Sequence, residues 1–263
     1  MARLYAEDLQ IQYGERTIVE NLSVSIPEGK ITVIIGSNGC GKSTLLKALT
    51  RIIPHQKGSI VLDGENIVKE STKQLAQKMA VLPQTPESAG SLTVGELISY
   101  GRFPHQNRFG RLAKKDLEII DWALDVTGTR FFKSHPVDSL SGGQRQRVWI
   151  AMALAQETDM IFLDEPTTYL DLAHQLEILE LLQQLNATEK RTIVMVLHDL
   201  NHAARFADYI IGMKFGQIVK SGPCEEIITK SVLRELFQID AELGVDPRTG
   251  KPICITYNLV RGE

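Results

Sequence analysis

The sequence has few cysteines and no long hydrophobic run, and each shortage excludes a class of protein. Its three cysteines, Cys40, Cys224 and Cys254, lie far apart and form no C-x-x-C pair. This spacing argues against a zinc site and a secreted disulfide framework, so we expect free thiols in a reducing cytoplasm. Apolar runs such as ITVII and TIVMVL are too short to span a bilayer, and the charged start MARLYAEDLQ does not resemble a signal peptide. A membrane role would therefore need the helices of another chain.

Neither sign of charge dominates. The 263 residues carry a net charge of −3, with 43% apolar and 23% charged residues, which is typical of a soluble globular protein. This balance gives no global attraction to nucleic acid or to an anionic membrane. One local stretch, GRFPHQNRFGRLAKK, has five Lys and Arg residues and no acid between Arg102 and Lys115, with Phe103 and Phe109 among them. Taken alone it indicates a solvated loop, with nucleic-acid binding as the alternative.

Short apolar runs alternate with helical patterns over most of the chain. Residues 3–13 and 17–26 alternate in polarity around YGER, which predicts two antiparallel strands. The later runs ITVIIG, MAVLPQ, MIFLDE and TIVMVLHD are separated by helical stretches, as is typical of buried strands in a largely parallel α/β sheet. Functional side chains are then expected at the carboxyl ends of these strands.

The strand signals stop between Pro83 and Gln156, where helical pieces begin near Thr93, Lys114 and Ser141. We therefore expect a single domain with three parts. Residues 1–84 and 156–222 would form a core with an antiparallel β subdomain, residues 85–155 an inserted helical subdomain, and residues 223–263 two short helices and a turn-rich tail.

The strongest functional signal is the segment GSNGCGKS, which follows ITVII and precedes the helical TLLKALTRI. It matches a phosphate-binding loop in its strand–loop–helix context, and predicts the fold of a P-loop NTPase. Backbone N–H groups would surround phosphate oxygens, Lys42 would reach the β- and γ-phosphates, Ser43 would bind Mg²⁺, and Thr44 would touch the α-phosphate. Cys40 is expected to pack rather than react. The loop residues are Gly36, Ser37, Asn38, Gly39, Cys40, Gly41, Lys42 and Ser43.

Three polar residues follow two other predicted strands. After MIFL, Asp164 would hold Mg²⁺ through water, and Glu165 would orient or deprotonate the water that attacks the γ-phosphate, a role that needs an unpaired carboxylate. After TIVMVL, His198 would donate a hydrogen bond to the γ-phosphate. Without the phosphate-binding loop, the acids would be interpreted as turn or cap residues and the histidine as a structural cap.

The stretch LSGGQRQRVWIAMALA raises a question that local structure does not answer. Ser141, followed three residues later by Gln144, predicts a capping box at the start of a helix. A capping box does not require Gly142 and Gly143 in the first turn, where each costs about 1 kcal/mol relative to alanine. Their bare backbone must have another purpose.

LSGGQ, with the upstream phosphate-binding loop and the downstream MIFLDE, resembles the nucleotide-binding subunits of ATP-binding cassette (ABC) transporters over nearly the whole chain. The resemblance implies that Tyr13 stacks on adenine, Gln84 of VLPQ senses the γ-phosphate and Mg²⁺, and Asp171 of TYLD lies at the interface between nucleotide sites. Without the resemblance, these three residues would be interpreted as a sheet-surface tyrosine, a loop glutamine and an N-cap aspartate. Thr168 replaces the serine that the family often has, and keeps the hydroxyl.

The resemblance also implies that two copies pack head to tail. Ser141, Gly142, Gly143 and Gln144 of one copy would then face the ATP held by the other copy, which explains the two glycines. ATP and Mg²⁺ are the implied cofactors. ATP binding would close the dimer and hydrolysis would reopen it.

The segments GRFPHQ, PTTYLDLAHQLEIL and DPRTGKPICI look like those of ATPase subunits of bacterial ferric siderophore importers, with haem and cobalamin importers as relatives. This resemblance implies a homodimer on the cytoplasmic face of the membrane, beneath two permease subunits and served by an extracytoplasmic substrate-binding protein, without nucleic acid. Residues near 86–109 would face the permease. Iron is not an expected cofactor, because no ligand cluster is visible in the sequence.

A soluble ABC ATPase without a transport role is the alternative from another class. Chromosome-type members have a long coiled coil before the signature, and residues 44–139 hold no sustained heptads. Ribosome-associated members carry two cassettes in one chain, and this chain has one. An iron–sulfur cluster assembly ATPase is not excluded by these features and remains the alternative. A P-loop kinase of small molecules would explain neither LSGGQ nor His198.

Overall fold

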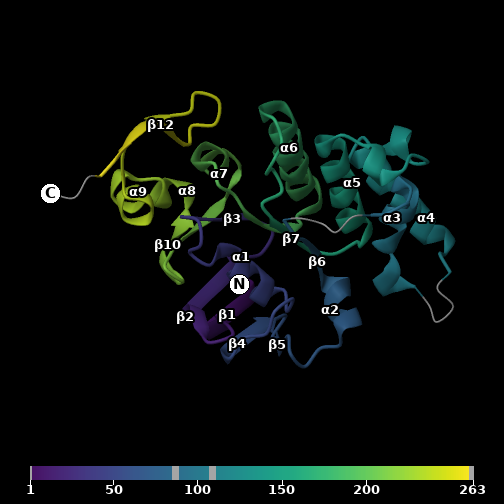
Figure 1. Ribbon diagram of the computed structural model, residues 1–263, viewed down its shortest axis with the longest axis horizontal. Coiled ribbons are helices and arrows are strands. Elements are labelled where there is room, and N and C mark those ends of the chain that lie inside the picture. The colour runs from purple at the N-terminus through teal and green to yellow at the C-terminus, as the bar shows by residue number, and fades with distance from the viewer. Residues whose placement is uncertain (1, 85–88, 107–110, 261–263) are drawn as a thin grey trace. The chain divides into compact units, whose positions relative to one another are not determined.

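The computed structural model describes residues 2–84, 89–106 and 111–260 (Figure 1). These residues form two compact units. The first unit comprises Met1–Lys69 and Thr192–Glu263, and the second unit is Glu70–Arg191. The chain therefore leaves the first unit once and returns to it at Thr192.

An antiparallel sheet in the first unit is built on the N-terminal hairpin. The strands β1 (Ala2–Tyr13) and β2 (Arg16–Pro27) pair as the alternation of polarity predicts. Two further strands, β4 (Lys57–Leu62) and β5 (Glu65–Asn66), extend the sheet in the order β2-β1-β4-β5. These last two strands are not predicted from the sequence, because neither has a long enough alternating pattern.

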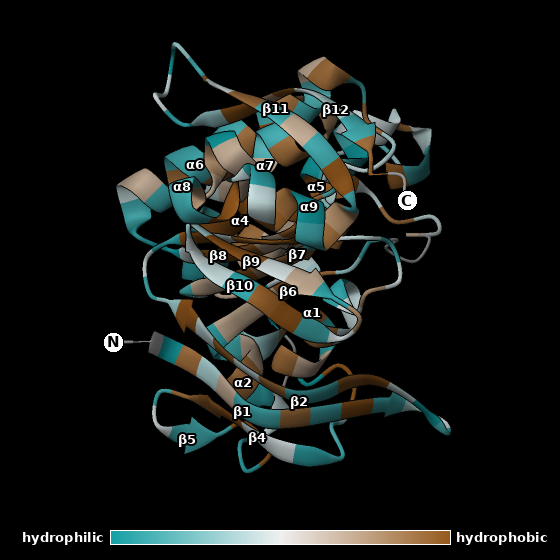
Figure 2. Cartoon of the chain, turned by 90° about the vertical axis from the view of Figure 1, so that its left-hand side faces the viewer, coloured by the Kyte–Doolittle hydropathy of each residue, from teal (hydrophilic) through white to brown (hydrophobic). Residues whose placement is uncertain are grey.

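Parallel strands form the centre of the first unit. The strand β3 (Ile31–Gly36) lies between β8 (Thr192–Val196) and β9 (Tyr209–Lys214), parallel to both, and β10 (Gln217–Pro223) pairs antiparallel with β9. All residues of β3 and β8 are buried, which explains their uninterrupted apolar sequences. The helix α1 (Lys42–Leu49) packs between these strands and the antiparallel sheet (Figure 2).

The C-terminal part of the first unit corrects one expectation. The helices α7 (Leu200–Phe206), α8 (Cys224–Ile227) and α9 (Lys230–Phe237) precede the final segment. That segment, expected to be turn-rich, is a hairpin of β11 (Ile239–Val245) and β12 (Pro252–Leu259). Only its connection is a turn, which the Asp246 carboxylate stabilises by accepting hydrogen bonds from the Arg248 N–H and the Thr249 hydroxyl.

The described residues of the second unit include two strands, β6 (Met79–Leu82) and β7 (Met160–Asp164), which run parallel with Leu82 opposite Leu163. The helices that begin near Thr93, Lys114 and Ser141 are found as predicted. The α-helices of this unit are α2 (Thr72–Lys78), α3 (Val94–Tyr100), α4 (Lys114–Val126), α5 (Gly142–Ala155) and α6 (Leu172–Glu189). Short 3₁₀ turns lie at Phe103–His105, Arg130–Phe132 and Val137–Ser139.

Arg102 is buried, contrary to the interpretation of its basic stretch as a solvated loop. Its side chain is 2% exposed, and its Nε donates to Asp116 Oδ1 at 2.8 Å. One terminal nitrogen donates to the Ala155 carbonyl at 2.8 Å and to Glu157 at 3.2 Å. A buried guanidinium requires such partners. In contrast, the Lys114 side chain is 92% exposed, as a solvated face predicts.

Candidate functional site

The phosphate-binding loop follows β3 and is shaped by its glycines. Gly39 and Gly41 have φ values of +75° and +105°, in the left-handed region that favours glycine. Gly36 lies against β9, where a Cβ would stand 2.2 Å from the Met213 carbonyl oxygen. No heavy atom lies within 4 Å of a Cβ built on Gly39. The loop therefore has glycine where the backbone needs it, and is open at its tip.

The helix α1 starts without a side-chain cap, at Gly41. Within the described residues, six other helices begin with a side chain that accepts a hydrogen bond from a backbone N–H group of their first turn, and these caps are Ser71, Thr93, Ser141, Asp171, Asp199 and Thr229. An uncapped helix N-terminus presents backbone donors and the positive end of the helix dipole. At a glycine-rich loop this combination suits a phosphate group.

Lys42 and Cys40 have different environments in the loop. The Lys42 amine donates to the carbonyl oxygens of Gly36 and Ser37 at 2.9 and 3.1 Å, so the cation lies over the loop backbone. Cys40 is buried, and burial raises the pKa of its thiol, although the nearby Lys42 charge opposes this effect. Cys40 is thus a packing residue, as expected from the sequence.

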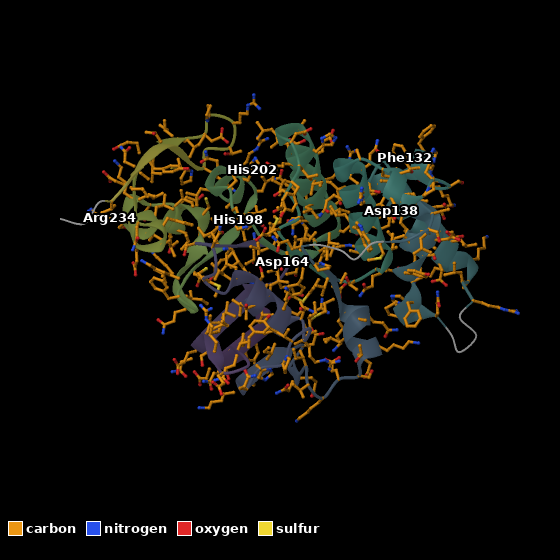
Figure 3. The ribbon with its side chains drawn as sticks, viewed as in Figure 1. Phe132, Asp138, Asp164, His198, His202 and Arg234 are labelled. Carbon is orange, nitrogen blue, oxygen red and sulfur yellow. The ribbon has the colours of Figure 1, made fainter. Side chains whose placement is uncertain are left out.

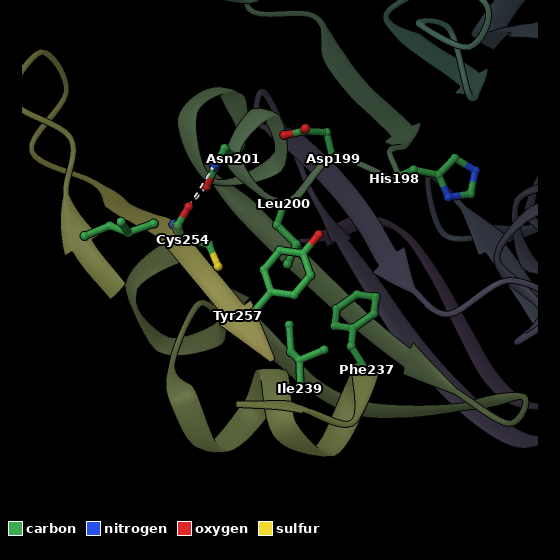
Figure 4. Close-up of a pocket in the computed structure, with 9 residues that line it drawn as sticks. His198, Asp199, Leu200, Asn201, Phe237, Ile239, Cys254 and Tyr257 are labelled. Carbon is green, nitrogen blue, oxygen red and sulfur yellow. Dashed lines mark hydrogen bonds between the residues drawn. The ribbon is translucent and has the colours of Figure 1, made fainter. Parts of the chain in front are cut away.

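His198 follows β8, and the phosphate-binding loop follows its parallel neighbour β3. Ile34 pairs with Val196, so both segments leave the same edge of the sheet. The cap of α7 is not His198 but Asp199, whose Oδ1 accepts from the His202 N–H at 2.7 Å. His198 is exposed and lies beside a cavity of about 460 Å³ between α7, α9 and β12 (Figure 4).

Tyr13 ends β1 opposite Arg16 and is 49% exposed. An exposed ring at the end of a strand fits both interpretations of this residue, as a ring that stacks on adenine and as a tyrosine on the surface of the sheet. Its proposed contact with adenine therefore stays a prediction.

Gln84 and Glu165 lie together in the second unit because they follow the parallel neighbours β6 and β7. Gln84 Nε2 donates to Glu165 Oε2 at 2.5 Å, and the Thr168 hydroxyl donates to the same oxygen at 3.0 Å. The expectation of an unpaired carboxylate at position 165 is therefore wrong. Asp164 is the last residue of β7 and is 2% exposed (Figure 3).

The capping box in LSGGQ is confirmed, and the two glycines differ. The Ser141 N–H donates to Gln144 Oε1 at 3.0 Å, and the Gln144 N–H donates to the Ser141 hydroxyl at 3.4 Å. A Cβ on Gly142 would meet nothing within 4 Å, whereas one on Gly143 would stand 2.6 Å from the His174 ring. Contacts within the chain thus explain why residue 143 is glycine. No contact within the described part of the chain explains the glycine at position 142.

Asp171 caps α6, as the alternative interpretation of this residue predicts. Its Oδ1 accepts from the His174 N–H at 3.0 Å and contacts His174 Nδ1 at 2.7 Å. The backbone hydrogen bond from His174 lowers the pKa of this carboxyl. His174 has no role predicted from the sequence. The D-x-x-H spacing at a helix start would have indicated this contact, because the N3 side chain lies near the cap.

The predicted magnesium ligands are chemically suitable. Ser43, Gln84 and Asp164 offer a hydroxyl, an amide carbonyl and a carboxylate, which are the oxygen ligands that Mg²⁺ prefers. Ser43 lies in α1 of the first unit, and the other two lie in the second unit. Among the described residues, no group of three or more His, Cys, Asp or Glu side chains is arranged to hold a metal.

The parallel strands, the glycine loop before α1 and the antiparallel sheet define an α/β P-loop NTPase of the ATP-binding cassette class, as predicted from the sequence. Residues 19–168 match the ABC transporter family, and the chain belongs to that family. ATPases of this class bind and hydrolyse ATP. Within the described ranges, no helix has the length and the apolar composition needed to cross a membrane.

The chain is 59% identical over 263 residues to the iron(3+)-hydroxamate import ATP-binding protein FhuC of Bacillus subtilis, covering 100% of this chain and 98% of that protein. It is 45% identical over 255 residues to the ferric enterobactin transport ATP-binding protein FepC of Escherichia coli, covering 97% and 94%. The dimeric structure of the bacterial ABC transporter cassette MJ0796 is similar, with a TM-score of 0.75 and 28% identity over 84% of this chain and 98% of that one.

Proposed function

We propose that this chain is the ATP-hydrolysing subunit of an importer that carries a ferric siderophore or a related iron chelate through a separate membrane permease. The observation that carries the proposal is the 59% identity, over the full chain, to an iron(3+)-hydroxamate import ATP-binding protein. The petrobactin import ATP-binding protein FpuD of Bacillus anthracis, 49% identical over 254 residues, supports the same substrate class. The chelate itself is a substrate of the permease and does not touch this chain.

The proposed nucleotide chemistry follows the residues described above. Lys42 binds the β- and γ-phosphates, and the backbone of residues 36–43 and Thr44 surround the phosphate chain. Glu165 orients the attacking water and takes its proton, and His198 donates to the γ-phosphate. Held by Ser43, Gln84 and Asp164, Mg²⁺ would neutralise charge that develops on the phosphate oxygens.

The proposed active form contains two copies of the chain. Ser141, Gly142 and Gln144 of one copy face the ATP held by the loop of the other, Asp171 lies at the interface, and Tyr13 stacks on adenine. Supporting observations are the open surface at Gly142 and the dimeric structure of the MJ0796 cassette. A helix N-terminus without a Cβ lets backbone donors approach a phosphate closely.

We place the dimer on the cytoplasmic face of the membrane, against two permease subunits that receive substrate from an extracytoplasmic binding protein. Residues 86–109 are proposed to face the permease. Pro86 and Phe109 lie outside the described residues, but Tyr100 and Phe103 are 55% and 74% exposed, as a docking surface requires.

Isolation of the native complex from membranes, followed by identification of its other subunits, tests this proposal. We expect a permease to co-purify with the chain. We also expect cells without the chain to stop taking up radioactive iron presented as ferric hydroxamate, with recovery by the wild-type chain but not by Lys42→Ala. Isolation with iron–sulfur assembly proteins and without a permease would contradict the proposal.

A further inference from the structure

The helices α5 and α6 of the second unit touch at their first turns (Figure 1). The His174 ring lies against the backbone at Gly143, and one turn further along both helices Arg147 donates to Glu177 at 2.5 Å. The two helix starts are therefore side by side, and run in the same direction from 143 to 147 and from 174 to 177. Ser141 caps one helix and Asp171 caps the other.

The His174 ring is fixed on two sides. Its Nδ1 lies 2.7 Å from Asp171 Oδ1, and because a carboxylate only accepts, Nδ1 is assigned as the donor. On the other side, a Cβ at position 143 would stand 2.6 Å from Cδ2, 2.9 Å from Cγ and 3.2 Å from Nε2 of the ring. The ring thus occupies the space that any larger residue at 143 would need. Asp171 sets its orientation, and Gly143 gives it room.

We infer that His174 is a positioning residue, which holds the turn at Ser141–Gly143 and the turn at Asp171 of one copy in a single fixed arrangement. Both turns are proposed to meet the second copy, so the inference rests on the proposed two-copy ATP site. Gly142, which has open space around it, is left for the nucleotide. Gly143 serves the contact with His174 instead.

If the turns at Ser141–Gly143 and at Asp171 are already aligned in one copy, the association of two copies becomes more favourable. Two surface segments that move independently must both be ordered when a partner binds, and this ordering weakens binding. Segments already fixed by internal contacts avoid that loss. His174 would therefore favour the ATP-bound dimer without touching ATP itself.

The test uses the full chain carrying Glu165→Gln, which keeps ATP from being consumed, and measures ATP-driven self-association by sedimentation velocity. Adding His174→Ala should weaken self-association about tenfold, because the two turns must then be ordered when the partner binds. ATP binding to the monomer and the melting temperature should stay the same. His174→Asn, whose amide nitrogen replaces Nδ1, should recover most of the loss.

A second test enlarges the side chain at position 143 and removes the ring at position 174. Gly143→Ala should lower the melting temperature and weaken self-association, because its Cβ meets the ring, and His174→Ala added to it should restore the melting temperature. Gly142→Ala should weaken self-association without lowering the melting temperature, and His174→Ala should not rescue it. Glu177→Gln is the matched control, because it removes the negative charge from the neighbouring contact between the same helices and should leave self-association unchanged.

Three results would overturn the inference. These are wild-type self-association of His174→Ala, an equal loss in Glu177→Gln, and a melting temperature of Gly143→Ala that His174→Ala does not restore. If two copies of the parent Glu165→Gln chain do not associate with each other in the presence of ATP, the proposed two-copy site is wrong, and the inference is wrong with it. The parent measurement therefore separates the two failures.

Discussion

Gln84 and Thr168 donate hydrogen bonds to the same oxygen of Glu165, at 2.5 and 3.0 Å. Gln84 follows β6 and Thr168 lies in the turn after β7, so the carboxylate is held from two directions. A carboxylate oxygen can accept more than one hydrogen bond, so both contacts can form at once. The proposed general base is therefore oriented by neighbours in its own unit.

Glu165→Gln should bind ATP with an affinity within about twofold of wild type and lose at least about 100-fold in turnover, because an amide cannot accept the proton. The ATP-bound dimer should accumulate. Phosphate release and nucleotide binding measure the two effects, with Glu118→Gln on the exposed face of α4 as the control. Normal turnover in Glu165→Gln would remove this residue from the mechanism.

Thr168→Val should lower kcat about fivefold to tenfold and leave KM for ATP nearly unchanged. The substitution keeps the shape of the side chain and removes the hydroxyl that donates to Glu165. Poor orientation of a catalytic group affects the chemical step more than substrate binding. Thr168→Ser keeps the hydroxyl and should retain most of kcat. A Thr168→Val enzyme with full kcat would show that the contact has no catalytic value.

The sequence predicts those parts of the structure that depend on local patterns. The uninterrupted apolar runs of β3 and β8 and the loop with Lys42 are found as predicted, because burial on both faces of a sheet and phosphate binding each leave a local signature. The contact of Gly143 with His174 is not predictable in this way, since it depends on how α5 packs on α6. The same is true of Arg102, whose burial depends on partners far along the chain.

Arg102→Met should destabilise the protein by about 3–5 kcal/mol, because it leaves the Asp116 carboxylate buried without its cationic partner. Asp116 is 6% exposed and lies 2.8 Å from the guanidinium. Denaturation by guanidinium chloride measures the free energy of unfolding. Lys114→Ala, which removes an exposed pair with 3.9 Å between Lys114 Nζ and Glu118 Oε1, should change it by less than about 1 kcal/mol. Equal effects of the two substitutions would contradict this prediction.

Asp116 should also make stability depend on pH in the acid range. Burial raises the pKa of this carboxyl, but the Ala113 N–H and Arg102 outweigh burial, so the net pKa in the folded state is lowered. Its stabilising contribution is therefore present above the unfolded pKa of about 3.9, and is lost as the pH falls through the folded value. Asp116→Asn should flatten the fall in unfolding free energy below about pH 4. An unchanged slope would contradict the assignment.

The three thiols should react slowly in the folded protein. Cys40, Cys224 and Cys254 are all buried, and burial raises the pKa of each thiol, to about 11 for Cys224. The thiolate is the reactive form, so at about pH 8 only about one Cys224 side chain in 1,000 is reactive. Alkylation by iodoacetamide, followed by mass spectrometry of peptides, should be at least about 100-fold slower at Cys224 than in protein unfolded in guanidinium chloride. Labelling of folded Cys224 at the unfolded rate would show that the thiol is neither shielded nor shifted in pKa.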